Sequence, residues 1–270
     1  MMHVKTLDQI RALIIDMDGV LVRGATPLPG LSEFFSVLDT RQLDFVVATN
    51  NATTTPELLA DRLGTAGVRI PPSHVITSAM AAADYLRHHG NLDGKVFMVG
   101  ESPLRQALEA AGFEICTKSD GASAVVVGLD HEVSWRKLSE AAYAIGDGAM
   151  FIGTNPDPSI PTERGIAIGN GALLAALQVA TGIKPLVIGK PETHLFELAL
   201  HKLNTEPDET LVLGDRLDTD ILGGKNAGLA TALLLTGVTD RHDLENASIQ
   251  PDWVFDDLKA LSVELAAVTV

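Results

Sequence analysis

Two carboxylates one residue apart, Asp16 and Asp18, follow a short apolar run near the start of the chain. The run over residues 12–15 predicts a buried parallel strand, and open α/β sheets bind ligands at the carboxyl ends of such strands. Side chains alternate along a strand, so Asp16 and Asp18 are expected to point the same way if the extension continues. Gly19 comes next and lets the backbone turn while its N–H approaches an anion. Two acids facing one pocket are costly unless a cation holds them or one is protonated, and Mg²⁺ is the cation that suits such oxygen ligands.

Further polar residues stand directly after other apolar runs or in turns, as expected for a site at one edge of a sheet. These residues are Thr49, Asn50, Asn51, Lys190, Asp215 and Asp220. A threonine hydroxyl and a backbone N–H can bind a phosphate, a lysine supplies positive charge, and two more acids extend the first pair. Each residue alone also fits a helix cap, a surface charge or an Asx turn. Their order along the chain favours a shared site for an anion and a metal.

Strand-like and helix-like stretches alternate along the chain, which predicts an α/β fold. We expect Ser32, Thr55 and Ser134 to be helix N-caps. The predicted strands are 12–16, 45–49, 95–99, 124–128, 150–152, 185–188, 210–213, 231–235 and 253–255, the last at a sheet edge. The predicted helices are 32–38, 56–64, 79–89, 103–111, 134–145, 172–180, 193–203 and 221–227.

The middle of the chain has an α/β alternation of its own, which begins near residue 78 and ends near residue 184. After it the pattern of the first segment resumes. We therefore expect a core domain made of residues 1–78 and 185–270, interrupted by an inserted domain of residues 79–184.

The overall charge excludes two classes of partner. The chain has 20 basic and 35 acidic residues, a net charge of −15, which argues against binding nucleic acid or an anionic membrane surface. Cys116 is the single cysteine, so no intrachain disulfide is expected and a small core residue is the simplest role for it. No run approaches the roughly 20 apolar residues of a membrane span. We expect a cytoplasmic protein with no membrane partner.

Taken together, four segments resemble the motifs of the haloacid dehalogenase (HAD) superfamily. They are Asp16-Met17-Asp18-Gly19-Val20, Thr49-Asn50-Asn51, Gly189-Lys190-Pro191, and the segment from Gly214-Asp215 to Asp220. The large insert between the second and third motifs is similar to subfamily IIA, the NagD and 4-nitrophenylphosphatase group, and Thr154-Asn155-Pro156-Asp157 agrees with it. This resemblance implies a doubly wound parallel-sheet (Rossmann-like) HAD core with an inserted α/β cap domain. Val22, Ile168 and Asn170 depart from the pattern of the subfamily.

The resemblance also implies an activity, that of a Mg²⁺-dependent phosphatase acting on a small phosphomonoester through an aspartyl-phosphate intermediate. Asp16 is then the nucleophile, and Asp18 the general acid that must be protonated in the first step. The metal ligands are Asp16, the backbone carbonyl of Asp18, and Asp215, with Asp220 binding a metal-bound water or Lys190. The phosphate-binding residues are Gly19, Thr49, Asn50, Asn51 and Lys190, and the candidate substrate contacts in the cap are Asn155 and Asp157, which equally fit a turn after a strand.

Other functions remain open at this stage. A phosphotransferase or phosphomutase uses the same groups with an alcohol in place of water, and a non-catalytic binding or regulatory protein keeps the fold without turnover. A metal-dependent glycosyltransferase uses an Asp-x-Asp pair but gives no purpose to Lys190 or Asp215. The partner expected is a small phosphorylated metabolite of unknown identity. Relatives with this cap often form a homodimer through it, which is the oligomer that the resemblance implies.

Overall fold

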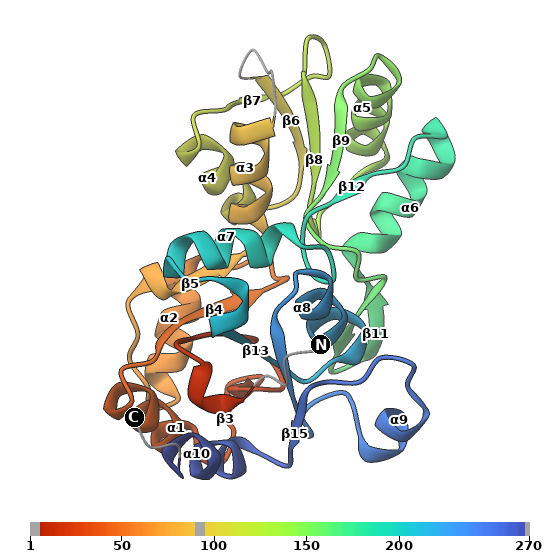
Figure 1. Cartoon of the computed structure of the whole chain (residues 1–270). Helices are drawn as coiled ribbons and strands as arrows, with labels where there is room; N and C mark the ends of the chain where they lie inside the picture. The colour runs from red at the N-terminus through yellow and green to blue at the C-terminus, as the bar shows by residue number, and fades with distance from the viewer. Residues whose placement is uncertain (1–5, 90–94, 268–270) are drawn as a thin grey trace. The chain divides into compact units, whose positions relative to one another are not determined.

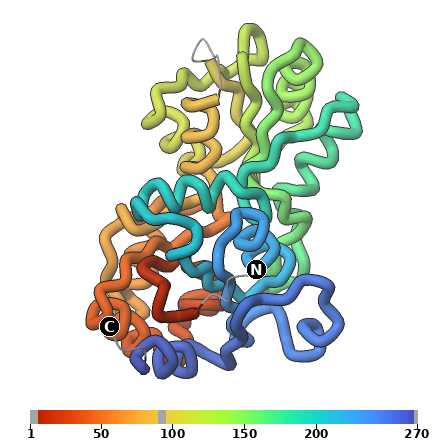
Figure 2. Tube along the Cα trace, in the orientation of Figure 1, coloured from red at the N-terminus to blue at the C-terminus, as the bar shows by residue number. Residues whose placement is uncertain are grey.

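The computed structural model describes residues 6–89 and 95–267, which divide into two compact units (Figure 1). The first unit contains the chain up to Thr49, Pro56–Ile76 and the chain from Lys190 onward, and the second contains Asn50–Thr55 and Thr77–Gly189. In Figure 2 the red and the blue segments belong to the first unit, and the yellow to green segments belong to the second. The second unit takes in residues 50–55, 77–78 and 185–189, which the sequence analysis assigned to the core.

The first unit is organised around a six-stranded sheet with the order β15-β14-β13-β1-β4-β5. Its strands are β1 (Ala12–Ile15), β4 (Asp44–Thr49), β5 (Val75–Thr77), β13 (Thr210–Gly214), β14 (Ala230–Leu234) and β15 (Trp253–Phe255). Strand β1 pairs in parallel with β13 and with β4, so that Ile15 lies beside Leu213 and Val47. The sequence continues to one side through β4 and β5 and to the other through β13, β14 and β15. The strand order therefore reverses between β1 and β13.

Helices and short turns connect these strands. They are α1 (Leu31–Thr40), α2 (Pro56–Thr65), α7 (His194–Leu203), α8 (Leu222–Asn226), α9 (Arg241–Asn246), α10 (Leu258–Ala267), the 3-10 turns η1 (Leu7–Gln9), η2 (Pro72–His74) and η3 (Pro207–Glu209), and the π-helical turn η4 (Leu217–Ile221). A small hairpin is formed by β2 (Val22–Arg23) and β3 (Thr26–Pro27). Helices α1 and α10 lie side by side, although they come from opposite ends of the chain (Figure 1).

One predicted helix cap is wrong. Ser32 lies inside α1, and the N-cap is Gly30, whose φ of 89° is in the left-handed region that favours glycine. The carbonyl of Gly30 accepts the N–H of Phe34 at 2.9 Å, which starts the helix two residues before the expected position. Ser134 is an N-cap as predicted, because its hydroxyl accepts the N–H of Lys137 at 3.2 Å at the start of α5 (Trp135–Gly146).

The core of the first unit is a cluster of buried apolar side chains contributed by the strands of the sheet and by the helices that pack on it. Leu13 and Ile15 of β1 pack with Leu213 of β13, Phe34 of α1 and Leu63 of α2 in this cluster. Full burial of each such side chain contributes about 1.5–3 kcal/mol. The ends of β1 and β13 are thereby held in fixed positions, which matters because polar residues follow both strands.

The second unit has its own five-stranded parallel sheet, with the order β12-β9-β8-β6-β7. Its elements are α3 (Ser78–His89), β6 (Lys95–Val99), α4 (Ser102–Ala110), β7 (Glu114–Cys116), β8 (Ala124–Val127), α5, β9 (Met150–Gly153), the hairpin β10 (Ser159–Thr162) and β11 (Gly165–Ile168), α6 (Asn170–Thr181) and β12 (Leu186–Val187). Helix α3 packs with α4, and α5 with α6. Cys116 is half-buried on the edge strand β7, against the apolar cluster of this unit.

The structure confirms the α/β class and the parallel sheets expected from the sequence. The ten-residue helix α10 was not predicted, nor were the short elements β2, β3, β5, β7, β10, β11 and α9. Across residues 6–89 and 95–267, no helix combines the length and the apolar character needed to cross a membrane.

Candidate active site

Three carboxylates meet at the carboxyl ends of β1 and β13, two of them buried and that of Asp16 partly exposed. Asp16 directly follows β1, and Asp215 directly follows β13, while Asp220 comes from the turn η4. Their carboxylate oxygens all lie within 4.8 Å of one another. The N–H of Asp16 donates to the carbonyl of Leu213 at 2.8 Å, which extends the pairing of the two strands up to the site. This is the point at which the strand order reverses, where open α/β sheets place their ligand crevice.

Lys190 supplies the positive charge of this cluster. Its Nζ donates to Asp16 Oδ1 at 2.5 Å, to Asp220 Oδ1 at 2.6 Å and to the carbonyl of Ala48 at 3.1 Å. Only 3% of Lys190 is exposed. Burial disfavours the ammonium, but the carboxylates of Asp16 and Asp220 outweigh it and raise the pKa of Lys190 above its ordinary value. The lysine therefore stays charged, and Asp220 binds it directly, one of the two roles expected for that residue.

Burial is also the largest influence on the pKa values of Asp16 and Asp215. It raises the pKa of Asp16 well above its ordinary value; Lys190 lowers it, whereas the nearby Asp220 and Asp215 raise it further. Burial and the charge of Asp220 raise the pKa of Asp215 to about 6, against the opposing N–H of Val238 and the charges of Lys190 and Arg216. The one positive charge of Lys190 does not balance the negative charges that three carboxylates would carry when ionised. The cluster is therefore an environment that favours an added cation.

Glycines leave the space that Asp215 and Asp220 occupy. A Cβ on Gly19, whose φ is +84°, would lie 2.3 Å from Asp215 Oδ2, and a Cβ on Gly237 would lie 1.8 Å from the same atom. The N–H of Val238 donates to this oxygen at 2.7 Å. The sequence led us to expect Gly19 near an anion, whereas no role was predicted for Gly237. A glycine two residues after the strand-like run 231–235 was the available signal.

The donor set fits a hard divalent cation such as Mg²⁺. It consists of oxygen atoms alone, Asp215 and Asp220 are buried, and the three carboxylates share the single positive charge of Lys190. Oδ1 of Asp16 accepts a hydrogen bond from Lys190, and Oδ2 of Asp215 accepts one from the N–H of Val238. The second carboxylate oxygen of each residue can bind a cation. Asp220 uses Oδ1 for Lys190, and its Oδ2 accepts the N–H of Arg216 at 3.2 Å. Asp220 is thus better placed to hold Lys190 than to ligate a metal directly.

Asp18 does not join this cluster with its carboxylate. The chain leaves the extended conformation after Ile15 and turns, with the N–H of Gly19 donating to the carbonyl of Val22 at 2.8 Å. The carboxylate of Asp18 instead accepts a hydrogen bond from Arg62 Nη2 at 2.5 Å, and its side chain is 55% exposed. The expectation that Asp16 and Asp18 point the same way depended on continued extension and is wrong for this structure.

Thr49, the last residue of β4, is buried beside β1 in the first unit. Four other expected contacts belong to the second unit, namely Asn50, Asn51, Asn155 and Asp157, and three of them form one network. Asn155 Nδ2 donates to the carbonyl of Asn50 at 2.9 Å, Asn50 Nδ2 donates to Asp157 Oδ2 at 3.1 Å, and the N–H of Asp157 donates to Asn155 Oδ1 at 3.2 Å. The structure therefore brings together Asn50, Asn155 and Asp157, which the sequence suggested separately.

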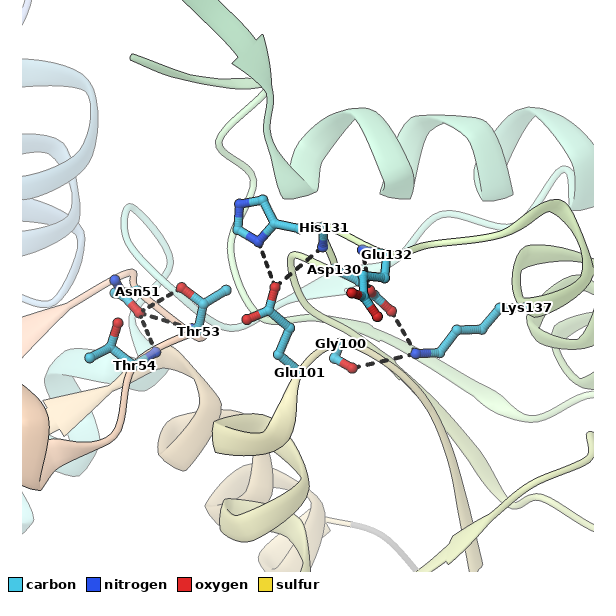
Figure 3. A network of polar contacts seen from close by, with 9 residues as sticks. All are labelled: Asn51, Thr53, Thr54, Gly100, Glu101, Asp130, His131, Glu132 and Lys137. Carbon is cyan, nitrogen blue, oxygen red and sulfur yellow. Dashed lines mark hydrogen bonds and ion pairs between the residues drawn. The ribbon is translucent and has the colours of Figure 1, made fainter. Parts of the chain in front are cut away.

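Asn51 has a capping geometry. Its Oδ1 accepts the N–H groups of Thr53 and Thr54 at 2.8 and 2.9 Å, an Asx turn just before α2 (Figure 3). Its side-chain oxygen therefore serves the turn, although the sequence suggested a phosphate contact for this residue.

Figure 3 shows a second polar network, at the carboxyl ends of β6 and β8, that the sequence analysis missed. His131 Nδ1 lies 2.5 Å from Glu101 Oε1, and Lys137 Nζ donates to the buried Asp130 at 2.5 Å. The strand order of the second sheet reverses between β6 and β8, so this is its counterpart of the β1/β13 position. Each of these two strand-like runs is followed by a glycine and an acid, as in the first unit. That pattern could have indicated this network from the sequence.

Known proteins resemble this chain over almost its whole length. A family model described as haloacid dehalogenase-like hydrolase matches residues 13–114, and a second model of HAD-like hydrolases matches residues 187–261. An acid sugar phosphatase of Staphylococcus epidermidis is 40% identical over 256 residues, which is 94% of this chain and 98% of that protein. The chain belongs to the haloacid dehalogenase-like hydrolases. Within this family it is a phosphatase of the NagD-like subfamily IIA, as the motifs predicted.

Solved structures of this family share the fold. A 4-nitrophenylphosphatase from Thermotoga maritima superposes with a TM-score of 0.91 at 33% identity, covering 99% of this chain and all of that one. A glycerol phosphate phosphatase from Mycobacterium tuberculosis, solved in complex with magnesium, has a TM-score of 0.88 at 36% identity, covering 96% of this chain and 78% of that one.

Proposed function

We propose that this HAD phosphatase hydrolyses a small phosphomonoester with the help of Mg²⁺, using Asp16 as the nucleophile. The observation that carries the proposal is the Asp16 carboxylate, whose side chain is 13% exposed and which lies 2.5 Å from Lys190 and is grouped with Asp215 at the β1/β13 reversal. A carboxylate with a fixed cationic neighbour can approach an anionic phosphate, because the lysine offsets the repulsion between them. The magnesium-bound glycerol phosphate phosphatase supports the choice of metal.

The reaction divides into two balanced steps. In the first, an oxygen of Asp16 attacks phosphorus, the bond from phosphorus to the ester oxygen breaks, and Asp18 gives its proton to the leaving alcohol. In the second, water attacks the phosphorus of the aspartyl phosphate, Asp18 takes the proton, and Asp16 is released with inorganic phosphate. When held by Asp16, the Asp18 carbonyl and Asp215, Mg²⁺ supplies positive charge that keeps these carboxylates ionised and neutralises phosphoryl oxygens.

The remaining site residues bind or select the substrate. We assign the phosphoryl oxygens to Lys190, the Thr49 hydroxyl and the N–H groups of Gly19 and Asn50. We assign substrate selection to the second unit as a cap domain, with Asn155 and Asp157 as candidate contacts. A sugar phosphate is the substrate class favoured, since the Staphylococcus epidermidis relative is an acid sugar phosphatase. A homodimer formed through the cap and a cytoplasmic location stay predictions.

The test is phosphate release from a panel of sugar phosphates, glycerol phosphate and 4-nitrophenyl phosphate, with Mg²⁺ or with a chelator present. Release that needs Mg²⁺ and disappears in Asp16→Asn is the expected result. Mg²⁺-dependent release that persists in Asp16→Asn would contradict the role of Asp16. A second sugar added as acceptor separates hydrolysis from phosphoryl transfer, because transfer yields a new phosphorylated sugar in place of free phosphate.

A further inference from the structure

We propose that Thr236 is a positioning residue that holds the turn after Asp16 in place for metal binding. It lies in the segment of residues 236–239, which follows β14 and Leu235 and is called the β14 loop below. None of the four residues of this loop is acidic, and none was predicted to belong to the site. The inference rests on the proposed function, because it assumes that Mg²⁺ binds beside Asp16 and Asp215.

The β14 loop holds the segment that follows β13. The N–H of Val238 donates to Asp215 Oδ2 at 2.7 Å, and the N–H of Thr239 donates to the backbone carbonyl of Asp215 at 3.1 Å. The hydroxyl of the buried Thr239 also accepts the N–H of Leu217 at 3.4 Å, at the start of the turn η4 that carries Asp220. Both the side chain and the backbone of Asp215 are therefore bound to this loop.

The same loop also reaches the turn that follows β1. Strand β13 lies between β14 and β1 in the sheet, so the loop has to extend past the end of β13 to make this contact. The hydroxyl of Thr236 donates to the carbonyl of Gly19 at 2.6 Å. Two glycines allow the close approach, because a Cβ on Gly19 would lie 3.1 Å from the Cα of Gly237 and 2.3 Å from Asp215 Oδ2. Thr236 therefore links the turn after Asp16 to the loop that holds Asp215.

The β2–β3 hairpin holds Thr236 in its turn. Arg23 Nη2, from β2, donates to the backbone carbonyl of Thr236 at 2.6 Å. The neighbouring residue Val22 accepts the N–H of Gly19 at 2.8 Å with its carbonyl. Gly19, Val22, Arg23 and Thr236 thus form a closed ring of contacts, and the hydroxyl of Thr236 acts on the turn from a fixed point.

The turn at Gly19 depends on such contacts because glycine restricts its own backbone less than other residues do. The carbonyl of Asp18, a metal ligand in the proposed function, belongs to the peptide group directly before Gly19. Rotation of the turn would move this carbonyl relative to Asp215. Residues that orient metal ligands without binding the metal strengthen metal binding. We therefore expect the Thr236 hydroxyl to raise the affinity of the site for Mg²⁺.

The test measures Mg²⁺ binding directly, by calorimetric titration of the whole chain with no phosphate ester present. Thr236→Val keeps the branched shape of threonine but removes the hydroxyl, and it is expected to weaken Mg²⁺ binding about ten-fold or more. Thr236→Ala also lacks the hydroxyl and should show the same loss without the second methyl group of valine. Thr236→Ser keeps the hydroxyl and should bind Mg²⁺ nearly as tightly as the wild type.

Thr210→Val is the matched control for loss of stability. The hydroxyl of Thr210 also donates to a backbone carbonyl, that of Glu206, at 2.9 Å. Thr210 is fully buried, but it is the first residue of β13, at the opposite end of this strand from Asp215. Removing its hydroxyl leaves a carbonyl without this donor, so the melting temperature should fall. The affinity for Mg²⁺ should stay that of the wild type.

Three outcomes would overturn the inference. Wild-type Mg²⁺ binding by Thr236→Val would show that the hydroxyl does not position the site, and the proposed function would stand without it. A loss of binding that is as large in Thr236→Ser or Thr210→Val as in Thr236→Val would show a general structural effect. If the wild type binds Mg²⁺ no more tightly than Asp215→Asn does, the metal site of the proposed function is wrong, and this inference fails with it.

Discussion

Lys190 and Asp16 are 174 residues apart in sequence, yet Lys190 Nζ lies 2.5 Å from Asp16 Oδ1. The lysine also contacts Asp220, so one ammonium connects the segment after β1 with the turn after β13. All three side chains are largely inaccessible to solvent. Burying one of these charges without an opposite charge beside it is costly, so the ammonium of Lys190 and the carboxylates stabilise one another.

Replacing Lys190 with methionine should therefore destabilise the protein as well as inactivate it. Removing one partner of a buried ion pair costs about 3–5 kcal/mol, because the other charge is left uncompensated. Urea unfolding without metal measures the loss. The matched control is Lys225→Met, which breaks the partly exposed pair with Asp252 and should cost only about 0–1 kcal/mol. Equal losses in the two variants would contradict the assigned role of Lys190.

Replacing Asp16 with asparagine should abolish activity without harming the fold. Loss of a nucleophile lowers turnover by about 10³-fold or more. Stability should stay equal or rise, because the change removes one of three mutually repelling acids while leaving Asp220 to pair with Lys190. Phosphate release and thermal unfolding check the two parts separately. A melting temperature well below that of the wild type would mean that Asp16 stabilises the metal-free fold.

The raised pKa values predict a pH dependence of the metal-free protein. The pKa of Asp215 is about 6 when folded and about 3.8 when unfolded, so between these values the folded state binds more protons. Its stability should therefore fall as the pH rises through this window, by about 3 kcal/mol at 1.4 kcal/mol per pH unit. The raised pKa of Asp16 acts in the same direction, and Lys190 stays charged throughout.

Magnesium should reverse this trend, since a cation favours the ionised carboxylates. The increase in melting temperature on adding Mg²⁺ should be larger near pH 7.5 than near pH 5. The variant Asp215→Asn should lose the part of the pH slope that Asp215 contributes, while Asp16 keeps its own part, and it should lose most of the response to Mg²⁺. A Mg²⁺ effect that is independent of pH would contradict metal binding by these acids.

Adding one methyl group at Gly237 should weaken metal binding. The new Cβ would lie 1.8 Å from Asp215 Oδ2, so the carboxylate has to move. Displacing a ligand in this way is expected to lower Mg²⁺ affinity about 10–100-fold, the scale seen when ligand orientation is lost. Titration of Mg²⁺ against activity checks this. Gly64→Ala in α2 is the control: a Cβ meets nothing within 4 Å there, and alanine should stabilise the helix by about 0.5–1 kcal/mol.

The helices and strands could largely be read from the sequence, because most follow from apolar runs and capping residues. Short elements such as β5 and the β10–β11 hairpin were missed because two to four residues give no clear period. The cap at Ser32 was wrong because a glycine two residues earlier provides a left-handed start, and a serine inside the first turn looks the same in sequence. The boundaries of the second unit depend on Asn50 and its hydrogen bonds to Asn155 and Asp157, which no local pattern indicates.

The sequence by itself determined the chemistry available to this protein: acids after strands, a lysine in a turn, and glycines that leave room for them. Tertiary structure alone decided which of these groups meet. Parallel pairing of β1 with β13 brings Asp16 and Asp215 together at the reversal of strand order, and the return of the chain at Lys190 adds the compensating charge. The tertiary structure also pairs the Asp18 carboxylate with Arg62 and not with Lys190, because strand β1 ends at Ile15 and the backbone turns after it. Side-chain direction depends on backbone turns and distant partners, and neither is encoded in the spacing of two residues.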